Sequence, residues 1–413
     1  MKNVFLIGNG FDLHHRLPTK YFDFICVAKY LTNTTLSEPL HIGKILLGCN
    51  GSQNIKDCYD AHKDTFDNAE IDFKKAIEIV QLLQDNIWFN YFVKTLDMDL
   101  GWIDFEQQIL TVIECLDNNI TSESSEISLP RRDMVAPFIF NNFKYFLDIN
   151  KGYDIYEGDI LDIKEEYLKE FICGSKIYVA DKKKIFEKLY VDLLSFSKAL
   201  NMYLYYFVEN VLNQISKDPY IKNNRIDLVN QANYCVSFNY TSTLERLYFN
   251  KYVYHIHGTV NNNDIVLGVN PNASDDIGTN NTSLIKFKKY YQREVRGTDK
   301  EYIDWYRQTI GAKVDYRLVI IGHSLDETDK DILSDMFMNA SEIYVSYYDE
   351  NCRDDYIANI VKIFGKSGYD SFRKDKSMKF IPLSDINTLD DVLQPEEAKW
   401  SVAWDRGEEI VIV

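Results

Sequence analysis

The sequence of 413 residues lacks several features that would assign it to particular classes of protein. No apolar stretch reaches the roughly 18 residues of a membrane span. Only residues 4–7 form an apolar run before Gly8, so we expect no secretory signal. The seven cysteines are odd in number and never fall as C-x-x-C, which argues against a disulfide framework and a cysteine zinc site. These absences predict a cytoplasmic protein with no membrane segment and no metal.

Positively charged residues are outnumbered by negatively charged ones. The chain has 46 Lys and Arg residues against 63 Asp and Glu residues, which gives a net charge of −17. An acidic surface of this kind disfavours bulk binding to nucleic acid or to anionic membranes. Aromatic residues, in contrast, are abundant at 14%, so the packing of the protein depends on large rings.

Apolar runs of strand length lie near the N-terminus and again after residue 230. The run at residues 4–7 stops at Gly8, and the later runs are residues 234–238, 252–256, 265–269, 318–321, 343–347 and 379–382. Runs that are apolar on both faces are typical of central strands in a parallel sheet. Helical patterns separate them, at residues 241–249, 329–338 and 354–364. This alternation predicts βαβ units and an α/β fold.

The stretch from residue 20 to residue 229 has a different pattern. Residues 71–83, 105–116 and 184–212 carry apolar side chains at helical spacing, without an internal Pro or Gly. We therefore expect a parallel-sheet core of residues 1–19 and 230–383, with a helical insertion of residues 20–229 after the first strand. Residues 384–413 have little pattern and are expected to form a C-terminal appendage.

Four of the apolar runs end in glycine or in short polar residues. They are followed by Gly8-Asn9-Gly10-Phe11-Asp12, by Asn239, by His257-Gly258 and by Gly322-His323-Ser324. The carboxyl ends of parallel strands meet at one edge of the sheet, where open α/β folds bind their ligands. The sequence therefore predicts that these residues come together in one nucleotide-binding site.

The pair of glycines after the first run is suited to bind a phosphate group. Gly8 and Gly10 allow the backbone to approach a phosphate closely, at the start of the following helix. Position 13 is Leu, however, and no acidic residue stands in a short βαβ unit about 20 residues further on, so a hydride-transferring dehydrogenase is not expected. A simple strand-to-loop turn is the alternative explanation of the two glycines.

Asn239 and His257 are spaced for the ends of two neighbouring strands. An asparagine can hold a sugar hydroxyl or a water molecule, and a histidine can accept a proton near neutral pH. A structural role for His257 is the alternative, and His255, two residues earlier, is assigned to core packing. Gly322 is explained by close approach of a ligand, whereas a helix cap accounts for Ser324 and Asp326.

The N-terminal block resembles a known family. Gly8 to Leu13, followed by Leu17-Pro18-Thr19 and by Tyr21-Phe22-Asp23-Phe24, is similar to the N-terminal signature of the AbiH family of bacteriophage abortive-infection proteins. Later blocks of that family resemble residues 102–106, 237–241, 257–258 and 321–326. Within residues 102–106, Asp104 and Glu106 are also ordinary charges for a helix start.

The same blocks, in the same order, are similar to the NAD-binding core of sirtuin-like domains. The resemblance implies a Rossmann-like, sirtuin-like fold, with Asn239 and His257 as catalytic residues. Contacts to NAD+ are expected from Gly8, Asn9, Gly10, Phe11, Gly258, Gly322, His323 and Ser324. The chain departs from sirtuins at Asn9, where they have Ala, and at Phe11-Asp12, and it has no counterpart of their four zinc cysteines. Cleavage of NAD+ is therefore expected rather than protein deacetylation.

Three functions remain open on the sequence, in order of preference. The first is an antiphage effector that hydrolyses NAD+ to nicotinamide and ADP-ribose, with His257 as base, Asn239 holding the ribose or the water, and Asp12 stabilising positive charge on the sugar. The second is a nucleotide-binding sensor or scaffold without turnover, as a homo-oligomer or with a defence-system partner bound through the helical insertion. The third is a nuclease, for which only Asp326, Glu327 and Asp329 offer acidic ligands.

Overall fold

The computed structural model describes residues 1–49, 51–98, 104–149, 153–173, 175–248, 252–269 and 284–389. The chain forms two compact units, and both are discontinuous in sequence. The first unit contains residues 1–19, 208–264 and 296–413, and the second contains residues 20–207 and 265–295. No helix in the described residues is long and apolar enough to cross a membrane.

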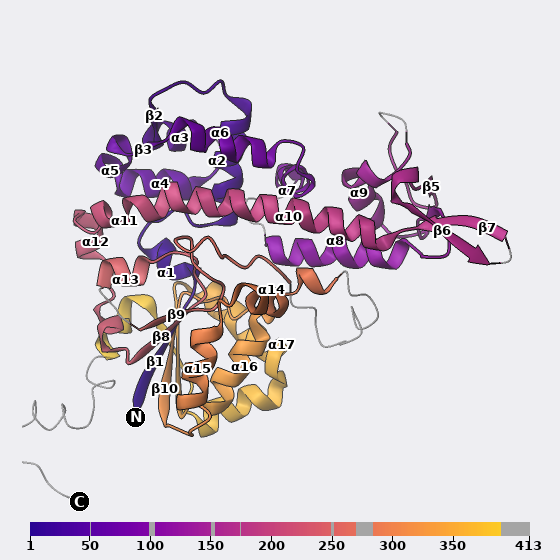
Figure 1. Cartoon of the computed structure of the whole chain (residues 1–413). Helices are drawn as coiled ribbons and strands as arrows, with labels where there is room; N and C mark the ends of the chain where they lie inside the picture. The colour runs from indigo at the N-terminus through magenta and orange to yellow at the C-terminus, as the bar shows by residue number, and fades with distance from the viewer. Residues whose placement is uncertain are drawn as a thin grey trace, which may run out of the picture. The chain divides into compact units, whose positions relative to one another are not determined.

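A six-stranded sheet forms the centre of the first unit (Figure 1). Its strands are β1 (Lys2–Ile7), β8 (Tyr234–Ser237), β9 (Val253–His255), β10 (Tyr316–Ile321), β11 (Glu342–Tyr347) and β12 (Lys379–Pro382). Their spatial order is β12-β11-β10-β1-β8-β9, and every neighbouring pair is parallel. When the six strands are numbered in chain order and read across the sheet from β9, this is the order 3-2-1-4-5-6 of Rossmann-type sheets. The predicted α/β fold with a parallel sheet is confirmed, and the strand order reverses between β1 and β10.

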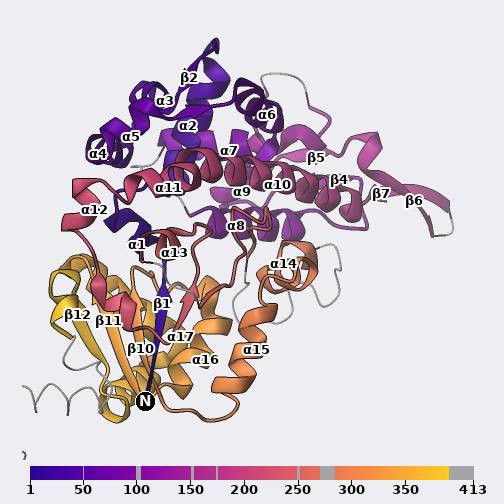
Figure 2. The same cartoon turned by 60° about the vertical axis from the view of Figure 1, so that its left-hand side comes forward.

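The central strands are buried on both faces, which explains their continuously apolar sequences. In β1, Val4 and Leu6 point to one face and Phe5 and Ile7 to the other, and none of the four is more than 1% exposed. The face of Val4 and Leu6 shares its core with α15 (Lys300–Thr309), α16 (Lys330–Asn339) and α17 (Glu350–Asp375), which lie along the sheet in Figures 1 and 2.

Shorter helices complete the first unit. They are α1 (Asn9–His14), α11 (Asn210–Ile215), α12 (Pro219–Asn223), α13 (Thr243–Tyr248) and the 3-10 turns η4 (Asp227–Gln231), η6 (Glu327–Asp329) and η7 (Leu383–Leu389). The three helical patterns expected after residue 230 thus correspond to α13, α16 and α17. The last is longer than predicted and is kinked at Gly365, whose φ is +71°.

Helices dominate the second unit. They are α2 (Tyr21–Asn33), α3 (Ile42–Gly48), α4 (Gln53–Ala61), α5 (Lys63–Asn68), α6 (Phe73–Leu83), α7 (Ile87–Met98), α8 (Phe105–Asn119), α9 (Val135–Asn142), α10 (Lys182–Leu204) and α14 (Lys289–Arg296). The side chain of Asp104 caps α8 by accepting hydrogen bonds from the backbone N–H groups of Glu106 and Gln107, as expected of a helix start. Trp102, the first residue of this block, lies outside the described residues.

Three two-stranded antiparallel sheets in the second unit were not predicted. They pair β2 (Leu40–His41) with β3 (Glu70–Ile71), β4 (Glu126–Ser128) with β5 (Ile160–Asp162), and β6 (Leu168–Cys173) with β7 (Ser175–Ala180). The first two are too short for an alternating pattern to be recognised. The third is long enough, but both of its faces carry exposed residues, so it has no contrast between a buried and a polar face.

One of the expected strands is wrong. Residues 265–269 form no strand, because the side chain of Gln292 binds both the N–H and the C=O of Leu267, at 3.2 and 2.9 Å. The helical pattern at residues 184–212 is confirmed, and a π-helical turn η3 (Tyr205–Glu209) lies in it between α10 and α11. Of the expected C-terminal appendage, residues 384–389 belong to η7 and residues 390–413 lie outside the described part of the chain.

The loops after β1 and β10 are in direct backbone contact where the strand order reverses. The N–H of Gly8 donates to the carbonyl of Ile321 at 3.0 Å, and the N–H of Gly10 donates to the carbonyl of Gly322 at 2.7 Å. A Cβ on Gly10 would lie 2.7 Å from the Cα of Gly322, and a Cβ on Gly322 would overlap the backbone nitrogen of Phe11. Gly322 also has a φ of +67°. Backbone-to-backbone packing therefore requires glycine at both positions.

Substitution of Gly322 tests this contact. Gly322→Ala should lower the free energy of unfolding by about 2–5 kcal/mol, because a methyl group overpacks the loop contact by about 1–3 kcal/mol and a left-handed backbone costs a residue with a Cβ about 1–2 kcal/mol. Gly297→Ala is the matched control, since Gly297 has a φ of +69° but a Cβ at this position would have no atom within 4 Å. It should show the backbone cost alone in urea unfolding. Equal losses for the two variants would contradict a role for the loop contact.

Candidate functional site

The carboxyl ends of four strands are linked by backbone hydrogen bonds at one edge of the sheet. The N–H of Phe238, after β8, donates to the carbonyl of Ile7 in β1 at 2.9 Å, and the N–H of Ile256, after β9, donates to the carbonyl of Ser237 at 3.0 Å. The contact of Gly8 with Ile321 joins β1 to β10 in the same way. The residues that follow these four strands, which the sequence predicted to meet, are therefore neighbours in the first unit.

Asp12 lies at the centre of this edge, on α1, and is completely buried. The hydroxyl of Thr241 donates to its carboxylate at 2.5 Å. Burial raises the pKa of Asp12 from 3.8 to about 7, and the negative charge of Glu209 adds to the rise. The hydroxyls of Thr241 and Thr243 and the side chain of Asn239 act in the opposite direction by stabilising the carboxylate. Both protonation states of Asp12 are consequently accessible near neutral pH.

Asn239 connects β8 to the glycine loop. Its side-chain nitrogen donates to the carbonyl of Gly8 at 3.1 Å, which fixes the orientation of the amide. Its Oδ1 is buried, and no group in the described residues donates a hydrogen bond to it. A buried acceptor without a donor is costly in a folded protein, so it marks a position where a ligand hydroxyl or a water molecule can donate.

His257 belongs to a buried cluster with two other polar side chains. Its Nε2 lies 3.0 Å from Oδ1 of Asp329, and Nε2 of His323 lies 3.5 Å from Oδ2 of the same carboxylate. The backbone N–H of Leu325 donates to Nδ1 of His323 at 2.9 Å, so neutral His323 carries its proton on Nε2, towards Asp329. The ring of Phe238 packs edge-on against both imidazoles. Asp329 therefore holds both histidines in fixed orientations.

The sequence did not predict the role of Asp329, because acidic residues are ordinary at a helix start. That explanation applies to Asp326, whose side chain accepts a hydrogen bond from the N–H of Thr328 at 2.9 Å. Asp329 occupies the N-cap position of α16 but makes no side-chain cap bond, and its carboxylate faces the histidines instead. In the described residues, no cluster of His, Cys, Asp and Glu side chains is arranged to hold a metal ion.

His255 has a different environment from the core packing expected for it. Its Nδ1 lies 2.9 Å from the carbonyl oxygen of Asn239, and its Nε2 lies 2.7 Å from the carboxylate of Glu245. Both partners can only accept hydrogen bonds, so both ring nitrogens must carry protons. Burial alone would lower the pKa of His255, but the carboxylate of Glu245 outweighs it and the pKa is raised. His255 is thus a charged residue that holds the backbone of Asn239 in place.

Glu209 is a second buried acid near Asp12 that the sequence did not reveal. It accepts hydrogen bonds from the backbone N–H and the hydroxyl of Ser242 and, at 2.9 Å, from the side-chain amide of Asn261. Arg246 lies 3.8 Å from the carboxylate. Glu209 occurs inside an apolar helical pattern, where one acidic residue gives no signal. Its position depends on the π-helical turn η3, a feature often found at functional sites.

The expected nucleotide-binding residues have varied surroundings. The N–H groups of Gly8, Gly10 and Phe11 are donated within the protein, the last to the carbonyl of Gly8 at 2.9 Å, so they do not form an open phosphate cradle. The ring of Phe11 is buried against His15 and Tyr248. Gly258 has a φ of +76° and no room for a Cβ beside Asp264. Asn9 and Ser324, in contrast, are exposed. The edge thus has an exposed rim, Asn9 and Ser324, and a buried floor, Asp12, Asn239 and His257.

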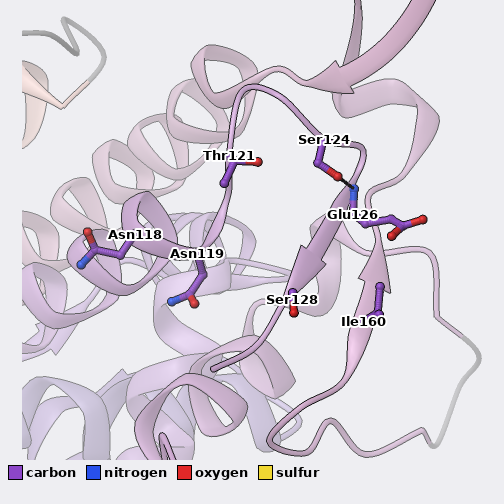
Figure 3. Close-up of a pocket in the computed structure, with 7 residues that line it drawn as sticks. All are labelled: Asn118, Asn119, Thr121, Ser124, Glu126, Ser128 and Ile160. Atoms are coloured by element: carbon purple, nitrogen blue, oxygen red, sulfur yellow. Dashed lines mark hydrogen bonds between the residues drawn. The ribbon is translucent and has the colours of Figure 1, made fainter. Parts of the chain in front are cut away.

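A polar hollow of about 280 Å³ occurs in the second unit (Figure 3). It is formed by the end of α8, the following loop and the strands β4 and β5, and it is lined by Asn118, Asn119, Thr121, Ser124, Glu126, Ser128 and Ile160. None of the predicted site residues lines it. The hollow is therefore separate from the site at the edge of the parallel sheet.

The raised pKa of Asp12 makes stability depend on pH. Because the folded-state value of about 7 exceeds the unfolded value of 3.8, the folded chain binds more protons between these values, and stability falls as the pH rises through that window. Asp12→Asn cannot ionise. The free energy of unfolding of Asp12→Asn minus that of the wild type should therefore increase from pH 5 to pH 8. The increase should be on the order of 3 kcal/mol, at about 1.4 kcal/mol per pKa unit. Urea unfolding at both pH values measures this change, and parallel pH dependence of the two proteins would contradict it.

Comparison with known proteins places the chain in a family. The family model described as "Bacteriophage abortive infection AbiH" matches residues 4–348, a region that contains every residue of the site described above. No curated protein and no solved structure matches the chain. Because the family model covers most of the chain, this protein belongs to the AbiH family of bacteriophage abortive-infection proteins.

Proposed function

We propose that this AbiH protein acts in abortive infection as an NAD+ glycohydrolase, which releases nicotinamide and ADP-ribose. One observation carries the proposal: the buried carboxyl group of Asp12 and the amide of Asn239 lie at adjacent strand ends, next to the strand that leads to His257. The strand order supports a nucleotide as the ligand, since Rossmann-type sheets bind nucleotides where the order reverses. The likeness of the same blocks to sirtuin-like domains favours NAD+ among nucleotides.

The reaction breaks the bond between C1′ of the ribose and the nicotinamide nitrogen. Nicotinamide leaves as a neutral molecule with the bonding electrons, and positive charge develops on the sugar. The carboxylate form of Asp12 stabilises this charge, and its buried position makes the interaction stronger than it would be in water. Water then attacks C1′ and loses a proton, so the products are nicotinamide, ADP-ribose and one proton.

Asn239 and His257 have complementary roles in this mechanism. The buried Oδ1 of Asn239 accepts a hydrogen bond from a ribose hydroxyl or from the attacking water. His257 takes the proton of the water as general base. The carboxylate of Asp329 orients the imidazole of His257 and stabilises its protonated form, as a buried acid does in other histidine-dependent hydrolases.

We expect the side chains of the rim, rather than the backbone of the glycine loop, to bind the phosphates of NAD+. The N–H groups of Gly8 and Gly10 are already donated to the loop after β10. Asn9 and Ser324 are exposed and carry hydrogen-bonding side chains. In this arrangement the glycines set the geometry of the site through their mutual packing, and the polar side chains of the rim bind the ligand.

The activity is tested by incubating the purified chain with NAD+ and measuring nicotinamide and ADP-ribose. The wild type should release both, and His257→Ala and Asn239→Ala should each lose about 100-fold or more in rate, as expected when a general base or a positioning group is removed. His41→Ala, in the second unit, is the control and should retain activity. Unchanged cleavage in both site variants would reject the assignment. Tight binding of NAD+ without product would instead favour the sensor without turnover.

The orienting role of Asp329 gives a separate prediction. Asp329→Asn retains the shape of the side chain but removes the charge that stabilises protonated His257. We expect kcat to fall by about 10²–10⁴, with a smaller change in KM, because the interaction is used in the transition state. Steady-state kinetics on a folded variant measures the two parameters. A rise in KM at constant kcat would show that Asp329 serves ligand binding instead.

A further inference from the structure

The hairpin of β6 and β7 has the properties of an interaction surface. It projects from the helices α8 and α10 of the second unit (Figures 1 and 2), and the two strands pair with each other along their length. Nine of the 20 exposed large apolar side chains in the described residues fall between residues 134 and 178, and three of them, Phe171, Ile177 and Tyr178, are on this hairpin. A concentration of exposed apolar side chains in so short a segment is typical of a binding surface.

One edge of the hairpin carries backbone groups that point away from the partner strand. The N–H of Asp181 donates to the carbonyl of Tyr167, so these two residues form a hydrogen-bonded pair. Alternation along the ladder then directs the N–H and C=O groups of Lys176, Tyr178 and Ala180 outwards. The N–H of Ala180 confirms this direction, since it donates to Ser124 outside the hairpin. The edge of β7 at Lys176 and Tyr178 is therefore suited to pair with another strand.

The side chains at this edge are complementary to a second copy of themselves. We propose that β7 pairs antiparallel with β7 of a second chain, about a two-fold axis at Ile177, to give a four-stranded sheet across the dimer. This register aligns the outward backbone groups of Lys176 with those of Tyr178 of the second copy. Lys176 already lies 5.8 Å from the ring centroid of Tyr178 within one chain, and the dimer repeats this cation–π contact between chains.

The same register joins the apolar side chains of the hairpin. Phe171 and Ile177 are opposite each other in one chain and are 48% and 40% exposed. Residues directly opposite in antiparallel strands share a face, so the dimer forms a continuous row from Phe171 through two copies of Ile177 to Phe171 of the second copy. A two-stranded hairpin alone is marginally stable in water, whereas a four-stranded sheet with an apolar row is more favourable.

Charge favours this occupant as well. The hairpin contains Lys169 and Lys176 against Glu170, a net charge of +1, in a chain whose net charge is −17. Two such acidic chains repel each other over most of their surface, so self-association requires a contact that is not acidic. The ion pair of Lys176 with Glu170, at 2.6 Å, is retained in the dimer because both partners lie in the same hairpin. The assembly is independent of the proposed NAD+ hydrolysis.

The oligomeric state of the full chain tests the proposal. Light scattering after size exclusion should give a dimer for the wild type and a monomer for Ile177→Lys, which places two positive charges at the two-fold axis. Val191→Lys is the matched control, since Val191 is another exposed β-branched residue of the second unit, on α10, and it should leave the dimer intact. A monomeric wild type, or a dimer that survives Ile177→Lys, would overturn the proposal.

A cross-link tests the register. Opposite residues of a non-hydrogen-bonded antiparallel pair have Cα atoms about 4.5 Å apart, which lies within the range for a disulfide. Ile177→Cys should therefore link to its own copy under oxidation by diamide, and Val191→Cys should not. In a mixture of ¹⁴N- and ¹⁵N-labelled chains, mass spectrometry should find the 177–177 peptide with one chain of each label. A hybrid link at another pair of positions would reject the two-fold axis at Ile177.

Discussion

The backbone contact between the loops after β1 and β10 positions the whole site. Gly10 donates to Gly322 at 2.7 Å, and neither residue has room for a Cβ. This contact determines where α1 begins, and therefore where Asp12 lies. It also sets the path of the chain after Gly322, which leads to His323 and to Asp329 at the start of α16. Phosphate binding is not needed to explain the glycines, because the close packing of the two loop backbones already requires them.

The polar groups of the buried floor must be stabilised by the surrounding protein. Each one depends on a neighbour: Asp12 on Thr241, Asn239 on the carbonyl of Gly8, and His257 on Asp329. Asp12 is incompletely compensated, since its pKa rises to about 7 in spite of three groups that stabilise the carboxylate. Such a residue reduces the stability of the fold at neutral pH. Retaining it is more easily explained by chemistry at the site than by packing.

The sequence predicts the parts of this protein that depend on local pattern. The continuous apolar runs predicted β1, β8, β9, β10, β11 and β12, and the polar residues after four of them predicted which residues meet. Long-range contacts explain the failures. Residues 265–269 are apolar enough for a strand, but the side chain of Gln292 binds the N–H and the C=O of Leu267 at their centre. Asp329 and Glu209 each fit a helix by local criteria, and only the fold brings Asp329 to His257 and Glu209 to Ser242.

The family match covers every strand of the sheet that carries the site. The match ends at residue 348, just after β11, and therefore omits α17 and β12. β12 is the edge strand beside β11, and α17 packs on the face of Val4 and Leu6, whereas the site lies at the ends of β1, β8, β9 and β10. The matched region thus includes the loop contact, the buried carboxyl groups and both histidines that face Asp329. The proposed site therefore lies in the part of the chain by which the family is recognised, whereas α17 and β12 lie outside it.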